Sequence, residues 1–192
     1  WFSSYPPRLR LLAGVWRTLE HVPVLVPSPL LYYLARLIRY PLLFMLCTAY
    51  GSATLIEEGC KYLILQRGFF RNPFFDQRMD GIVYAMSVSL GFAFAENLLY
   101  GLDGRNVLIL RAFTAVPLHA PASGLMGYFV AVSMENGQKQ GSQLRLAGFG
   151  LAVFIHGSYN FLLFLGGAAV YGALLVLLVG GLLFRSVVHK AF

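Results

Sequence analysis

Five long apolar stretches limit what this chain can fold into. They cover residues 41–66, 80–101, 107–132, 144–165 and 168–184, and each is close to the roughly 20 residues that a helix needs to cross a bilayer. Only 12% of the residues are charged, about half the share that is usual in a soluble domain. Because a soluble fold cannot cover so much apolar surface, the sequence predicts an integral, multi-pass membrane protein.

The stretches predict an all-α fold, a polytopic transmembrane helix bundle with at least five spans. Five is a lower bound, because the chain begins at Trp1 rather than at Met. Residues 41–185 are predicted to form a single transmembrane domain, followed by a C-terminal tail over residues 186–192. Residues 1–40 mix arginines and prolines with aromatic residues, which predicts interfacial helices and a short helical segment before the first span.

The positive charge of the chain does not indicate nucleic-acid binding. The net charge is +7, and in a membrane protein such an excess is typical of Lys and Arg side chains that meet anionic lipid headgroups. A nucleic-acid surface would need a soluble basic face with interleaved aromatic residues, and no such face is visible. The predicted loops carry seven Lys or Arg residues on each side, so charge does not determine the orientation.

Acids and histidines lie inside the predicted spans. Three of the five glutamates, Glu57, Glu58 and Glu96, fall within spans, and His119 and His156 lie near the middle of theirs. An ionised residue at the centre of a bilayer costs about 2.5–3.5 kcal/mol on insertion scales. Costly groups on four different spans therefore indicate one shared internal site rather than positions that face lipid.

The segment that contains Glu57, Glu58 and Lys61 has more acid than one lysine can neutralise. Lys61 follows Glu57 by four residues and Glu58 by three, and both spacings allow a helical ion pair. The spare carboxyl must stay protonated, bind a metal or act as a base. A buried ion pair that fixes packing explains the same residues, so this segment alone does not decide between structure and catalysis.

The other candidates are also ambiguous when they are taken singly. His119 lies between Pro117 and Pro121, which free backbone carbonyls and predict a kinked helix beside a wet pocket. His156 and Asn160 are four residues apart and share a helix face, where the amide could donate to an oxyanion. Each histidine could instead be a hydrogen-bonding core residue, and Glu96 could be a carboxylate at a helix end.

Together these residues predict a zinc site or a water-activating acid–base cluster. Other intramembrane chemistries are disfavoured, because the sequence contains no HExxH motif and no G-x-S-x-G elbow, and its aspartates lie in loops or at span ends. The candidate metal ligands are the two histidines with one or two of the three acids: His119, His156, Glu58, Glu57 and Glu96.

Four motifs in order resemble the PrsW family of membrane proteases, within the wider clan of CAAX prenyl endopeptidases and bacteriocin-processing proteins. The resemblance covers about residues 41–165. The motifs are an EExxK segment (Glu57, Glu58, Lys61), DGIVY followed by GFAFAEN (Glu96), LRAFTAVPLHAPASGLMGY (Arg111, His119) and HGSYN (His156, Asn160).

The resemblance implies an intramembrane protease of a bacterial cytoplasmic membrane. Its substrates would be membrane-anchored proteins such as single-span anti-sigma factors. We expect Glu57 or Glu58 to activate water, and Lys61 to tune the acid pair. We expect His119 and His156 to bind zinc, or to position water and oxyanion without it, and Asn160 to stabilise the oxyanion. A proton- or ion-coupled transporter and a non-catalytic membrane scaffold are the alternatives.

Overall fold

The computed structural model describes residues 41–69, 72–100 and 105–192, and within these ranges every regular element is a helix. The predicted all-α class is therefore confirmed. The interfacial helices predicted over residues 1–40 lie outside the described residues. The elements are α3 (Pro41–Cys47), the π-helix η2 (Thr48–Thr54), α4 (Leu55–Gly68), α5 (Arg78–Tyr100), α6 (Arg105–Phe113), α7 (Ala115–Met134), α8 (Gln138–Leu165) and α9 (Ala169–Ala191).

Four described helical segments are long and apolar enough to cross a membrane. They are Arg78–Tyr100, Leu108–Met134, Gln138–Leu165 and Ala169–Ala191. The predicted span at 41–66 is helical but is not among the four, because the stretch is divided into three consecutive helical elements, the longest of which has 14 residues. The prediction of at least five spans is thus not confirmed, whereas the multi-pass membrane class is. The last helix, α9, continues through residues 186–191 of the predicted tail.

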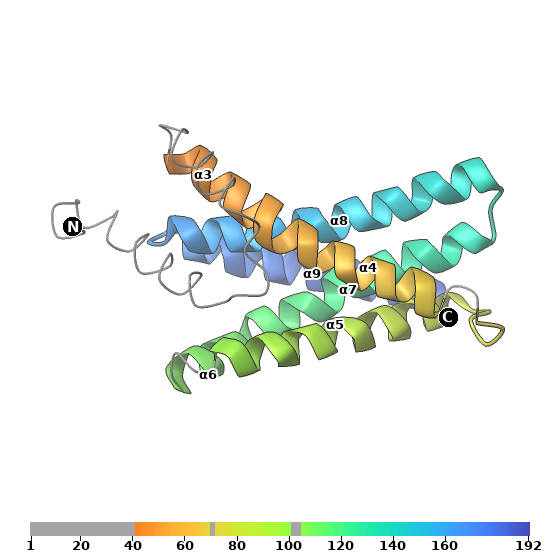
Figure 1. Ribbon diagram of the computed structural model, residues 1–192, viewed down its shortest axis with the longest axis horizontal. Helices are drawn as coiled ribbons and strands as arrows, with labels where there is room; N and C mark the ends of the chain where they lie inside the picture. The colour runs from red at the N-terminus through yellow and green to blue at the C-terminus, as the bar shows by residue number, and fades with distance from the viewer. Residues whose placement is uncertain (1–40, 70–71, 101–104) are drawn as a thin grey trace, which may run out of the picture.

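The central helix of the bundle is α7. About 61% of the apolar window that includes it is buried inside the protein, compared with 11% for α9. α7 packs against α5, α8 and α9, and α4 runs across the bundle and contacts α5, α7 and α8 (Figure 1). Side chains on the inner face of α7 therefore meet side chains from several helices, while the outer faces of α5, α8 and α9 present apolar residues to lipid.

The third predicted span is broken, although not at its prolines. The break between α6 and α7 lies at Thr114, whose backbone φ is −124° and ψ is −63°. Pro117 falls in the first turn of α7. Backbone N–H groups in the first turn have no hydrogen-bond partner within the helix, so the N–H that proline lacks is not needed there. Pro121 lies inside α7. His119 is thus held on a continuous helix between the two prolines.

Glycines bring α5 and α7 into very close contact. A Cβ atom on Gly127 would collide with the backbone carbonyl of Gly81 and with the Cβ of Ala85. Small residues are the usual means by which membrane helices approach each other so closely. This approach places the polar residues further along α5 within hydrogen-bonding reach of α7.

The π-helix η2 connects α3 to α4 and packs against α8. The ring of Tyr50 lies over Gly157, where any Cβ would collide with it, and the Tyr50 hydroxyl is 2.6 Å from Ser158 Oγ. Short π-helical segments occur frequently at functional sites. Here the segment ends at Thr54, one turn before the paired acids of α4.

Candidate active site

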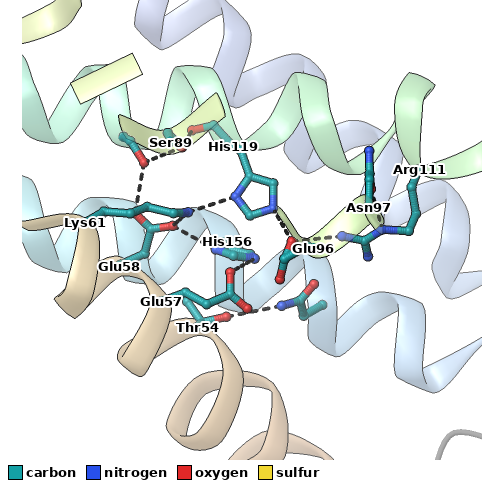
Figure 2. Close-up of polar contacts among 12 residues, drawn as sticks. Thr54, Glu57, Glu58, Lys61, Ser89, Glu96, Asn97, Arg111, His119 and His156 are labelled. Carbon is teal, nitrogen blue, oxygen red and sulfur yellow. Dashed lines mark hydrogen bonds and ion pairs between the residues drawn. The ribbon is translucent and has the colours of Figure 1, made fainter. Parts of the chain in front are cut away.

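Polar side chains from four helices meet inside the bundle, around two imidazole rings (Figure 2). The ring centroids of His119 and His156 are 4.7 Å apart, and both side chains are buried. The predicted convergence on one internal site is therefore confirmed in its geometry, while the catalytic roles remain predictions. The predicted residues come from α4 (Glu57, Glu58, Lys61), α5 (Glu96), α7 (His119) and α8 (His156, Asn160).

Glu58 is held by contacts with three other side chains. Its Oε1 accepts a hydrogen bond from Lys61 Nζ at 2.7 Å and lies 2.9 Å from His156 Nδ1. Its Oε2 accepts a hydrogen bond from Ser123 Oγ at 3.1 Å. The side chains of Glu58 and Lys61 are both fully buried. Glu58 therefore joins α4 to α7 and α8 as a fixed anion, and both its oxygens are already engaged.

Lys61 links this carboxylate to the other histidine. Its Nζ lies 2.8 Å from His119 Nδ1 and 5.7 Å from the centroid of the Phe92 ring. The sequence spacing allows an ion pair with either glutamate, and the structure forms the one with Glu58, three residues away. The choice follows from tertiary contacts, because His156 and Ser123 hold the Glu58 carboxylate where Lys61 reaches it.

Glu96 is part of the site and is paired with an arginine. Its Oε2 lies 3.1 Å from His119 Nε2 and accepts a hydrogen bond from Arg111 Nη2 at 2.8 Å. Arg111 Nε also donates to Asn97 Oδ1 at 2.9 Å, and the guanidinium carbon lies 3.9 Å from the centroid of the Tyr100 ring. Arg111 thus supplies a second cation to the site and fixes the carboxylate that faces His119.

Glu57 forms no hydrogen bond with a cation or an imidazole in the described structure, and its carboxyl group lies next to that of Glu96. Glu57 is buried, and no described residue forms a hydrogen bond with its Oε2 atom. This oxygen lies 3.9 Å from His156 Nε2, beyond the range of a hydrogen bond. Buried polar atoms without partners are rare in proteins, and each requires an explanation such as a catalytic role, a water or an ion.

Three of the residues form a group that could hold a metal ion. Glu57, His119 and His156 each offer one ligand atom, and these atoms all lie within 4.8 Å of one another. Carboxylate oxygens and imidazole nitrogens are common zinc ligands. The unpaired oxygen of Glu57 suits the same role, so the donor set fits a metal. Within the described ranges this group does not include Glu58 or Glu96, the other predicted ligands.

A cavity of about 280 Å³ opens beside the group. Asn160 lines it and donates from Nδ2 to Thr54 Oγ1 at 3.2 Å. Its polar wall is formed by Glu57, Glu96, Arg111, His119, His156 and Asn160, and much of the rest is apolar, including Leu118, Tyr159, Leu163 and Phe164. The volume lies near the lower end for small-ligand sites, and the walls combine ionisable groups with apolar side chains.

Sequence reasoning missed several residues that support the site. Thr54 holds Asn160, and Ser89 Oγ donates to the backbone carbonyl of His119 at 2.8 Å and lies 2.9 Å from Ser123 Oγ. Helical spacing gives only a weak signal for them, because a hydroxyl in a membrane helix is inexpensive. Thr54 lies three residues before Glu57, and Ser89 lies seven residues before Glu96, so each shares a helix face with an identified acid.

Similarity to known proteins extends over most of the chain. The model of the PrsW family of intramembrane metalloproteases matches residues 5–184. The protease PrsW of Geobacillus kaustophilus is 40% identical over 116 residues, and that of Oceanobacillus iheyensis is 38% identical over 116 residues. The protease PrsW of Bacillus subtilis is 36% identical over 114 residues. No solved structure matches the chain.

These alignments cover 58–60% of this chain and 51–54% of the relatives. The chain therefore spans about half the length of the curated relatives that it matches.

Proposed function

Because the chain belongs to the PrsW family of intramembrane metalloproteases, we propose that it is an endopeptidase that hydrolyses peptide bonds of membrane-anchored proteins. The observation that carries this proposal is the Oε2 atom of Glu57. It is a buried carboxylate oxygen that lacks a hydrogen-bond donor in the part of the chain that the structure describes, beside a cavity that can hold peptide. A general base needs such an oxygen free to receive a proton.

In the proposed mechanism Glu57 activates water together with His156. Glu58 accepts the hydrogen on His156 Nδ1, so the Nε2 atom of the same ring presents a lone pair toward Glu57 Oε2, 3.9 Å away. A water between these two acceptors donates a hydrogen to each, and its lone pairs then face the cavity. Glu57 takes the proton as the water oxygen attacks the peptide carbonyl, and it later delivers that proton to the leaving amine.

Two groups on the cavity wall can stabilise the oxyanion that forms. Asn160 uses one N–H of its amide to bind Thr54, and its second N–H is available to the cavity. His119 also lines the cavity, and its Nε2 points to Glu96 Oε2 at 3.1 Å, so this ring would donate to the oxyanion by sharing the hydrogen that Glu96 accepts. Donors that are fixed before the reaction stabilise developing charge without reorganising, and removing one typically costs about 10²–10³ in rate.

As the alternative to this metal-free mechanism, we assign zinc to the group formed by Glu57, His119 and His156, where the atoms of Glu57 and His156 that hold the water would be metal ligands instead. When bound there, zinc would polarise the peptide carbonyl and lower the pKa of its water to about 7. The protein would hold it with three ligand atoms that lie within 4.8 Å of one another. The ion pair of Glu58 with Lys61 orients His156 from behind, which is the usual role of a carboxylate next to a metal-binding histidine.

We also propose the substrate class. The site lies among helices that are long and apolar enough to span a membrane. This location favours a peptide from a membrane-anchored protein, and single-span proteins of the anti-sigma-factor kind are the candidates. The curated relatives are bacterial, which supports a bacterial cytoplasmic membrane as the place where the protein and its substrate meet.

Cleavage of a single-span reporter protein by purified protein in lipid nanodiscs tests the proposal. Glu57→Gln and His156→Ala should abolish cleavage. Glu135→Gln, a change at an exposed glutamate outside the cavity, is the matched control and should retain cleavage. If Glu57→Gln cleaves at the wild-type rate, the water-activating role is wrong. If no variant and no wild-type preparation cleaves any single-span reporter, but the protein moves protons or ions across a vesicle membrane, the transporter alternative holds.

The role of zinc is tested separately. The purified protein is stripped with a strong chelator, assayed, and assayed again after zinc is added back. Loss and recovery of cleavage support the zinc mechanism. If elemental analysis shows that the stripped protein is metal-free and it is still fully active, the zinc mechanism is ruled out. The glutamate–histidine mechanism then remains.

A further inference from the structure

We propose that the buried Lys61–Glu58 ion pair fixes the two imidazoles of the site in opposite tautomers, with the proton of His119 on Nε2 and that of His156 on Nδ1. Lys61 is then a positioning residue for His119. This inference deepens the proposed function and rests on it for its catalytic meaning: His119 enters the reaction as a hydrogen-bond donor, and His156 enters it as an acceptor.

The first step is the charge of Lys61. Its Nζ is surrounded by groups that attract a cation: a carboxylate oxygen of Glu58 at 2.7 Å, a ring nitrogen of His119 at 2.8 Å, and the face of the Phe92 ring at 5.7 Å. An ammonium group has three hydrogens to donate and no lone pair. The nitrogen of His119 that contacts it, Nδ1, must therefore accept the hydrogen bond.

The second step concerns Nε2, the other nitrogen of the His119 ring. Because Nδ1 of a neutral His119 accepts, its single hydrogen lies on Nε2. Nε2 lies 3.1 Å from Glu96 Oε2, and Arg111 donates to that same carboxylate oxygen from Nη2 at 2.8 Å. Glu96 is thus an ion-paired acceptor that requires a donor at Nε2. Contacts from opposite sides of the ring select the same tautomer.

The third step concerns His156, in which Nδ1 faces a carboxylate rather than an ammonium group. Its Nδ1 faces Glu58 Oε1 at 2.9 Å, and Lys61 already donates to this oxygen. Ser123 donates to the other oxygen of Glu58. A carboxylate that receives donors on both oxygens acts as an acceptor, so Nδ1 of His156 carries the hydrogen and Nε2 does not. This lone pair is the one that faces Glu57 across 3.9 Å.

The result is a division of roles between two residues that look equivalent in the sequence. Nε2 of His119 carries a hydrogen that Glu96 accepts at the cavity wall, and Nε2 of His156 presents a lone pair. The arrangement also bears on metal binding, because a metal bound to His119 through Nε2 would need the hydrogen on Nδ1, where it would face the hydrogens of Lys61. Lys61 must give up this hydrogen bond before His119 can serve as a ligand through Nε2.

Nitrogen NMR of the imidazole rings tests the proposal directly, because a protonated and an unprotonated ring nitrogen have well-separated shifts. The full chain is labelled with ¹⁵N-histidine, reconstituted in bicelles, stripped of metal and measured at a pH where the imidazoles are neutral. The four histidines are assigned from single His→Asn variants. We expect His119 to be protonated on Nε2 and His156 on Nδ1.

Variants of the lysine separate its effect from a general structural role. Lys61→Met removes one of the two contacts that select the His119 tautomer, so part of the His119 population should move its proton to Nδ1 although Glu96 still accepts at Nε2. The tautomer of His156 should stay in place, because Glu58 still accepts from it. Lys61→Arg keeps a donor and should preserve both tautomers. Lys139→Met, at an exposed lysine of α8, is the matched control and should change neither.

The proposal is overturned if the two wild-type rings have the same tautomer, if His119 carries its proton on Nδ1, or if Lys61→Met leaves the His119 signals unchanged. The wild-type spectrum suffices if Lys61→Met does not fold. Opposite tautomers together with an active Glu57→Gln variant would support this inference and contradict the proposed function, so the two can fail separately.

Discussion

Glu57 and Glu58 should respond very differently to the same change, replacement of the carboxylate by an amide of equal shape. Glu57→Gln should reduce cleavage by about 10²–10⁴-fold, the usual contribution of a general base, and should change stability little. Glu58→Gln should lower activity and also destabilise the fold. The sequence places these residues side by side in one motif, so the difference comes from their tertiary contacts.

The magnitudes follow from the partners of each carboxylate. The Oε2 atom of Glu57 has no hydrogen bond to lose in the described structure, and a glutamine at this position can still donate to the neighbouring Glu96 carboxylate. The change in the free energy of unfolding should therefore stay below about 1 kcal/mol, the net value of one hydrogen bond. Amidation of Glu58 leaves the fully buried Lys61 without its counter-ion. Removing one partner of a buried ion pair typically costs about 3–5 kcal/mol.

Both quantities can be measured on the same preparations. Reversible unfolding in mixed micelles with increasing SDS gives the difference in the free energy of unfolding. Cleavage of a single-span reporter under native conditions gives the rate. The reasoning is refuted if Glu57→Gln destabilises the protein as much as Glu58→Gln does, or if Glu58→Gln unfolds at the wild-type midpoint.

Three further predictions concern the supporting structure. Thr54→Val keeps the side-chain shape but removes the oxygen that binds Asn160, so the cleavage rate should fall roughly 2- to 10-fold, as expected for one hydrogen bond, and Thr54→Ser should restore it. Gly127→Ala puts a methyl group against a backbone carbonyl of α5 and should lower the free energy of unfolding by about 1–3 kcal/mol; Gly150→Ala, where an added Cβ meets nothing within 4 Å, is its control in the same SDS titration. Arg78→Ala breaks an ion pair whose side chains are 40% and 46% exposed, so the unfolding midpoint should not move, because exposed pairs contribute little; a clear downward shift would contradict this.

The spacing of polar residues within apolar stretches is sufficient to locate most of the site. Helical periodicity puts His156 and Asn160 on one face, and the cost of charge in a bilayer requires such groups to face inward. These two considerations predict that Glu96, His119 and His156 share a site. They do not predict Thr54 and Ser89 as site residues. A single hydroxyl group costs little free energy in a membrane helix, so its position carries no comparable signal.

The number of spans shows where a sequence pattern reaches its limit. Apolar length predicts a span over 41–66, and the structure folds this stretch into α3, η2 and α4, in which the charged residues Glu57, Glu58 and Lys61 of α4 face the other helices. Hydropathy records how much apolar surface a helix has. It does not record whether neighbouring helices cover the polar part of that helix.

The sequence by itself determined the membrane class, the helical fold and the set of polar residues that lie inside the bundle, because these depend on apolar length and on helical spacing within single segments. The tertiary structure decided which residue pairs with which. On an isolated helix Lys61 can reach Glu57 or Glu58 equally well, and only the arrival of His156 and Ser123 from α8 and α7 selects Glu58. The unpaired Oε2 atom of Glu57 and the tautomers that we propose for the two histidines follow from that selection, which requires side chains far apart in the chain to meet.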